Sequence, residues 1–188
     1  MPGLFCFWVF VVIFSSKNFK QEMKSEKLDE KGKVRFLKFD DYKWEGIEIK
    51  KYKDESNTWL DVCRQVIAGK YGERTKFHLR YFEIAPGGYS TLEKHKHEHV
   101  VICVRGKGKA IAGNEVYEMS FMDVLYIGSN VVHQFVNDSD EPFGFLCIVD
   151  AKRDKPKLLK KKEIFELLKD EKLSKILRIP ETYPTLKK

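Results

Sequence analysis

The chain has 188 residues, 43% of them hydrophobic, and a formal net charge of +7 at pH 7. This length suits one domain with a hydrophobic core and extensions, and is short for two such domains. Residues 151–188 contain 13 Lys and Arg against six Asp and Glu, whereas residues 1–150 balance at 22 against 22. Because the excess charge is confined to the tail, without a pattern of interleaved aromatic residues for base stacking, we expect no nucleic-acid partner.

The chain begins with an apolar segment, residues 4–14, of eleven consecutive apolar residues. A membrane-spanning helix needs roughly 20, so we expect no membrane association. No small-residue cleavage site follows, and four widely spaced cysteines without a CxxC pair favour a reducing compartment, which predicts a cytoplasmic protein. We interpret residues 1–22 as an N-terminal extension of uncertain status, because Met23 offers an alternative start, and residues 23–56 as an N-terminal arm.

Residues 57–150 show the pattern of a β-domain. Short runs with alternating or continuous apolar residues are separated by turns that contain glycine. Repeated short strands of this kind indicate a jelly-roll β-barrel. The predicted strands are residues 59–68, 77–84, 100–104, two strands within 106–117, then 124–127, 131–136 and 143–149.

The C-terminal extension, residues 151–188, changes to the apolar spacing of a helix from Lys157 onward. The apolar residues before and after residues 169–171 fall on different helical faces. We therefore predict two short helices, with Asp170 capping the second and Pro180 ending it. We expect these helices to pack on the barrel or on a second subunit.

Three of the five histidines, His95, His97 and His99, lie on alternate positions, and Glu93 extends the series. In an extended strand these four side chains share one face. A solvated surface strand would have the same composition. However, the apolar residues 100–104 follow directly, so we place the histidines on a hairpin that leads into the core.

A second hairpin contributes His133, which follows an apolar strand and a Gly-Ser-Asn turn. Imidazole and carboxylate ligands together suit a divalent transition metal, whereas Mg and Ca prefer oxygen ligands alone. The series and His133 therefore predict a site for one ion such as Mn, Fe, Ni or Zn.

The first hairpin resembles the first sequence motif of the cupin superfamily. The motif runs without a gap from Gly87 through Glu93, His95 and His99 to Gly106. Glu93 stands where the family usually has a histidine, and His99 stands where it usually has a glutamate. The exchange preserves the number of imidazole and carboxylate groups, so we interpret the metal site as retained.

The second hairpin resembles the second cupin motif, again without a gap. The motif runs from Met122 through Gly128, Asn130 and His133 to Asn137. Gly128 replaces a proline, and Met122 and Asn130 replace glycines. Asn130 is a mild change, because asparagine tolerates the left-handed conformation that such a turn needs.

The resemblance implies an all-β protein with a cupin jelly-roll β-barrel and a short C-terminal helical extension. It also implies a metal held by His95, His99 and His133, with Glu93 as the fourth group. His97 lies at the bend of the hairpin. Either it replaces Glu93 as a ligand, or it supports the ligands from outside.

The function implied by the resemblance is a metal-dependent enzyme, dioxygenase-like or an isomerase, that acts on a small organic molecule in the barrel. The alternative is a metal-containing module that binds or senses a small ligand without turnover. Tyr126, Phe135, Arg80 or Tyr81 would shape the pocket, and His78 would take no part in the site. Apolar faces on the arm and the C-terminal helices predict a homodimer.

Overall fold

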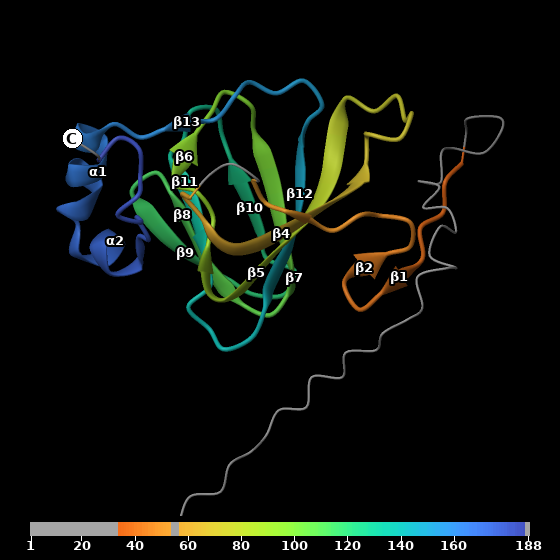
Figure 1. Ribbon diagram of the computed structural model, residues 1–188, viewed down its shortest axis with the longest axis horizontal. Coiled ribbons are helices and arrows are strands. Elements are labelled where there is room, and N and C mark those ends of the chain that lie inside the picture. Colours follow the sequence, from red (N-terminus) through yellow and green to blue (C-terminus); the bar gives the residue numbers. More distant parts are fainter. Residues whose placement is uncertain (1–33, 54–56, 187–188) are drawn as a thin grey trace, which may run out of the picture.

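The computed structural model describes residues 34–53 and 57–186. The predictions for residues 1–22, for the apolar segment 4–14 and for a start at Met23 lie outside these ranges. Within them, no helix is long and apolar enough to cross a membrane. Strands dominate, and the described helices are two short ones near the C-terminus (Figure 1). The predicted all-β class with a helical extension is confirmed.

One antiparallel sheet of eleven strands curls into a nearly closed barrel (Figure 1). Its main path runs β10-β7-β12-β5-β11-β6-β13, while β4 joins β5 to β3 and β8 joins β11 to β9. The strands are β3 (Lys50–Lys51), β4 (Leu60–Ala68), β5 (Phe77–Tyr89), β6 (Glu93–Lys94), β7 (His99–Arg105), β8 (Gly108–Ala112), β9 (Glu115–Met119), β10 (Val124–Ile127), β11 (His133–Val136), β12 (Phe143–Asp150) and β13 (Lys157–Leu158).

The hydrophobic core fills the barrel because strand residues alternate between its two faces. Along β7, for example, Val101 and Cys103 are fully buried while the residues between and beside them are half-buried. Phe143 and Phe145 of β12 pack ring against ring at a centroid distance of 5.2 Å. Burial of a side chain of this size contributes about 1.5–3 kcal/mol, so the core holds the strands that carry the histidines in fixed register.

The arm lies against the outside of the barrel. β1 (Phe39–Asp40) and β2 (Lys43–Trp44) pair with each other in a small separate sheet, and β3 pairs with β4. The rings of Tyr42 and Trp44 lie 6.0 and 5.3 Å from that of Tyr81. These contacts keep Tyr81 on the outer side of the sheet.

The C-terminal extension closes one side of the barrel with its own hydrophobic cluster. Helices α1 (Lys161–Leu168) and α2 (Glu171–Ile176) bury Ile164 and Leu173 against barrel residues such as Ile111. The Asp170 side chain accepts a hydrogen bond from the backbone N–H of Leu173, as the predicted cap requires. The predicted start of helical structure at Lys157 is wrong, because β13 pairs there with β6 before α1 begins.

Two positions where the cupin motif has glycine carry other residues in the left-handed region. Met122 has a φ of 69° and Asn130 a φ of 60°. Asparagine adopts this conformation readily, but for methionine the crowding between Cβ and backbone costs roughly 1–2 kcal/mol. Met122 keeps this geometry because its N–H donates to the Cys103 carbonyl at 2.8 Å, which fixes the turn before β10.

Replacing Met122 with glycine is therefore expected to stabilise the fold. The strain energy that is relieved exceeds the entropic cost of the extra freedom that glycine has in the unfolded chain. This cost is about 0.4–1 kcal/mol. The side chain is 60% exposed, so little burial is lost. Urea denaturation should show a gain of about 0.5–1 kcal/mol. Phe121→Gly is the matched control, because Phe121 is exposed and has no positive φ. This substitution should lower the stability of the protein. A loss of stability in both variants would contradict this account.

Candidate metal site

The ends of three strands position the histidines. Glu93 lies in β6, His99 opens β7, and His133 opens β11 in register with Glu93. Residues 95–98 form a bend between β6 and β7, so the four side chains do not share one extended strand, and His97 lies at the bend of the hairpin as expected. The Asp154 carboxylate stabilises the bend by accepting hydrogen bonds from the backbone N–H groups of residues 96 and 97, with N···O distances of 3.0 and 3.1 Å.

The side chains nevertheless converge, and all five are buried. The Nε2 atoms of His95 and His99 lie 2.8 Å apart, and the His133 ring centroid is 4.7 Å from that of His95. The donor atoms form two overlapping groups, each with all its atoms within 4.8 Å of one another. One group is His95, His97 and His99, and the other is Glu93, His95 and His133.

Each of the four histidines uses its Nδ1 atom for a bond inside the protein. His95 and His133 contact the carbonyl oxygens of residues 97 and 131 at 2.8 and 2.9 Å. The Nδ1 of His97 lies 2.8 Å from an Asp154 carboxylate oxygen. Because these oxygens accept hydrogen bonds, Nδ1 of all three rings carries the proton and Nε2 of the neutral ring keeps its lone pair.

His99 Nδ1 lies 3.1 Å from the Cys147 sulfur, which leaves its Nε2 directed at His95. Metal-binding histidines typically have their second nitrogen fixed in this way. The donor set of imidazole nitrogens and one carboxylate therefore fits a divalent transition metal.

Burial keeps the rings of His95, His99 and His133 neutral, as ligands must be. It lowers the pKa of His95 to about 4, with a further contribution from the neighbouring His133 and His97. The pKa values of His99 and His133 are also lowered, mainly by burial. At pH 7 these three imidazoles are therefore neutral, and each keeps one ring nitrogen with a lone pair for a metal ion.

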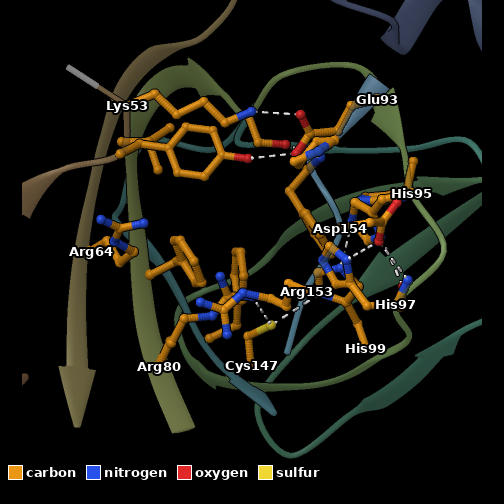
Figure 2. Close-up of a pocket in the computed structure, with 18 residues that line it drawn as sticks. Lys53, Arg64, Arg80, Glu93, His95, His97, His99, Cys147, Arg153 and Asp154 are labelled. Carbon is orange, nitrogen blue, oxygen red and sulfur yellow. Dashed lines mark hydrogen bonds and ion pairs between the residues drawn. The ribbon is translucent and has the colours of Figure 1, made fainter. Parts of the chain in front are cut away.

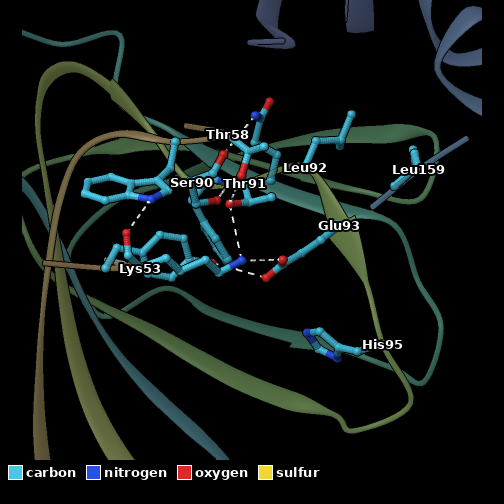
Figure 3. Close-up of polar contacts among 12 residues, drawn as sticks. Lys53, Thr58, Ser90, Thr91, Leu92, Glu93, His95 and Leu159 are labelled. Atoms are coloured by element: carbon cyan, nitrogen blue, oxygen red, sulfur yellow. Dashed lines mark hydrogen bonds and ion pairs between the residues drawn. The ribbon is translucent and has the colours of Figure 1, made fainter. Parts of the chain in front are cut away.

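Glu93 is held by two residues that come from the arm. Its carboxylate accepts from Lys53 Nζ at 2.5 Å and from the Tyr52 hydroxyl at 3.2 Å (Figure 3). Burial, together with the Glu93 charge, raises the pKa of Tyr52 well above its ordinary value, so the hydroxyl keeps its proton. His95 belongs to both donor groups, whereas His99 shares its group with His97 and His133 shares its group with Glu93. The predicted set of His95, His99 and His133 therefore draws on both groups.

The histidines form one wall of a cavity of about 230 Å³ (Figure 2). Phe82, Phe135 and Phe145 supply apolar lining, while Tyr52 and Lys53 close it beside Glu93. Such a volume accommodates a small molecule, with a few polar groups to orient it.

The family model for the cupin domain matches residues 80–149. A curated protein of Rhodospirillum rubrum, 1-methylthio-D-xylulose 5-phosphate methylsulfurylase, is 39% identical over 137 residues, which are 72% of this chain and 86% of that protein. The chain belongs to the cupin family. The resemblance seen in the sequence motifs is thereby confirmed.

Solved cupin structures agree with this assignment. A cupin-2 domain protein from Rhodospirillum rubrum is 37% identical, covers 78% of this chain and 94% of its own, and has a TM-score of 0.67. A cupin 2 conserved barrel protein from Rhodopseudomonas palustris is 35% identical, with coverage of 72% and 92% and the same TM-score.

Two of the four residues predicted to shape the pocket of this cupin do so. Phe135 and Arg80 line the cavity, whereas Tyr81 packs against the arm and Tyr126 is 60% exposed on the outer face of β10. His78 lies outside the donor groups, with its Nδ1 3.0 Å from an Arg153 nitrogen.

Sequence reasoning missed several residues of the site. Tyr52 and Lys53 come from the arm, Arg64 from β4 and Asp154 from the segment after β12. Cys147 also lines the cavity. Strand alternation along β12 would have placed Cys147 inward, but nothing in the sequence indicates which arm or tail residues reach the cavity.

Proposed function

We propose that this cupin is a metal-dependent enzyme that acts on a small phosphorylated ketose, of the class that includes a 1-methylthio-xylulose 5-phosphate. The observation that carries the proposal is the convergence of imidazole Nε2 atoms and one carboxylate on a cavity of small-molecule size. The curated relative supports the substrate class, because its name specifies a ketose phosphate with a methylthio group beside the carbonyl.

His95, His99 and His133 would hold the ion, with Glu93 or His97 as the fourth group. A divalent metal at this position supplies a Lewis acid for a carbonyl oxygen. The proposal therefore favours chemistry next to a ketone, as in isomerisation or bond cleavage, over the dioxygenase-like reaction. The elemental analysis described below identifies which of Mn, Fe, Ni and Zn is bound.

The residues around Glu93 supply the means to move a proton. The Tyr52 hydroxyl and the Lys53 ammonium both contact the carboxylate, and both line the cavity. A substrate hydroxyl or a carbon-bound proton placed here meets a carboxylate and a neutral phenol within one network. The three phenylalanines of the lining give the cavity an apolar surface beside that network.

The test begins with the full chain purified without added metal, whose metal content is measured by elemental analysis. Conversion of 1-methylthio-D-xylulose 5-phosphate by this protein is then followed by NMR, in a buffer that contains a thiol reductant. We expect about one metal ion per chain and conversion that stops on chelation and returns with the metal. D-Xylulose 5-phosphate, which lacks the methylthio group, is the matched control compound.

Two outcomes would contradict the proposal. Metal-loaded protein that binds the compound without changing it would favour the alternative, a binding or sensing module. Metal-loaded protein that neither binds nor converts it would show that the substrate class is wrong.

A further inference from the structure

Arginine side chains line the cavity beside the histidines, with Arg80 and His99 both in contact with the Cys147 sulfur. Figure 2 shows Arg64 and Arg80 grouped on one side of the pocket and the histidines on the other, with Arg153 between them in the view. Arg64 comes from β4, Arg80 from the neighbouring β5, and Arg153 from the segment after β12. Two neighbouring strands and a segment much later in the chain thus bring guanidinium groups to one cavity.

Arg80 is the buried member of this group, with only 9% of its surface exposed. One terminal nitrogen lies 3.2 Å from the Cys147 sulfur, and the guanidinium carbon lies 4.9 Å above the Phe82 ring. Its Nε atom is buried and has no hydrogen-bond partner among the described residues. A sulfur atom and an aromatic face are weak partners for a buried charge, which normally requires an anion and full hydrogen bonding.

Among the described residues, the two carboxylates that line the same cavity are engaged elsewhere. Glu93 is bound by Lys53 and Tyr52, and Asp154 by His97 and the backbone of the bend. Partial burial, followed by repulsion from Arg80 and then Arg64, lowers the pKa of Arg153, so the Arg153 guanidinium group lies close enough to the other two to be repelled by them. An anion between them would reduce that repulsion and offer an acceptor to the buried Nε–H group of Arg80.

We infer that Arg80, with Arg64 and Arg153, forms an anion subsite that binds the phosphate group of the substrate. Planar guanidinium groups match the geometry of phosphate oxygens and bind them through paired hydrogen bonds. The inference rests on the proposed function for the identity of the whole substrate. The arrangement would hold the substrate by its phosphate on the arginine side and direct the rest of the molecule toward the histidines and Glu93.

Calorimetric titration with inorganic phosphate tests the subsite without requiring turnover. The full chain is titrated both metal-loaded and after chelation, because phosphate held by the arginines should bind in both forms. Arg80→Gln should weaken binding roughly 10- to 100-fold, the value of a lost charge-assisted hydrogen bond to an anion, with metal content unchanged. Arg74→Gln is the matched control, since Arg74 is exposed and does not line the cavity, and it should leave binding unchanged.

Arg153→Gln keeps the test decisive if Arg80→Gln fails to fold, because Arg153 is exposed and its loss leaves the core intact. It should weaken phosphate binding several-fold. The inference is overturned if wild-type protein does not bind phosphate, if binding disappears on chelation, or if neither variant weakens it. Phosphate binding that depends on Arg80, in a protein that leaves the methylthio ketose unchanged, would support the subsite and count against the proposed function alone.

Discussion

Replacing His133 with alanine is expected to weaken metal binding by at least about 100-fold. Loss of a residue that only supports a ligand typically costs 10- to 100-fold, and loss of a ligand should cost at least as much. Among the donor groups of the described residues, His133 is the member supplied by β11, whereas the other four come from β6, the bend and β7. Its removal opens one side of the site.

Two further variants decide the fourth ligand. If Glu93 completes the set, Glu93→Gln should reduce metal affinity far more than His97→Ala; the reverse order would identify His97. His78→Ala is the control for removal of an imidazole, and it should leave the affinity unchanged, because His78 contacts Arg153 outside the site. Affinities come from competition with a chromophoric chelator. Full metal occupancy in His133→Ala would show that the ligand set is wrong.

The second large effect concerns the C-terminal helices. Ile164→Ala should lower the free energy of unfolding by about 2–5 kcal/mol, the usual cost of truncating a fully buried isoleucine. Ile164 is 0% exposed and belongs to the cluster that joins the helices to the barrel. Phe165→Ala on the same helix is the matched control, since Phe165 is 51% exposed, and it should change stability by no more than about 0.5 kcal/mol.

This prediction bears on the site because the extension holds the strand that carries Glu93. β13 pairs with β6, with Leu158 opposite Glu93, and Lys94 forms an ion pair with Glu163 of α1. Denaturant unfolding monitored by circular dichroism gives the stability of each variant. Equal stability of Ile164→Ala and Phe165→Ala would mean that the helices are an appendage, and that β6 is held by the barrel alone.

Local patterns in the sequence predicted much of the fold. The strand predicted at residues 124–127 coincides with β10, and the predicted break at residues 169–171 separates α1 from α2, with Asp170 as the cap. Such features depend on neighbours along the chain, so alternation and capping preferences reveal them. The spacing of the two motifs also predicted that Glu93, the histidines of the first hairpin and His133 lie close together. All of them belong to two short hairpins whose motifs can be recognised in the sequence.

Features that depend on distant segments could not be predicted. The bend around His97 was expected, but its contact with Asp154, more than fifty residues later in the chain, was not. Lys53 reaches Glu93 from the arm, and the arginines meet only because β4, β5 and the segment after β12 are neighbours. These contacts follow from strand order, which periodicity does not specify. The homodimer, the domain limits and the cytoplasmic location stay predictions.

The central claim is that one metal ion binds among the histidines of the barrel. Anomalous scattering from a crystal of the metal-loaded protein, recorded at the absorption edge of the metal found by elemental analysis, tests it most directly. The account predicts one strong peak per chain in contact with the Nε2 atoms of His95, His99 and His133. A metal-loaded protein with no peak at this position, or with its peak outside the cavity, would contradict the account.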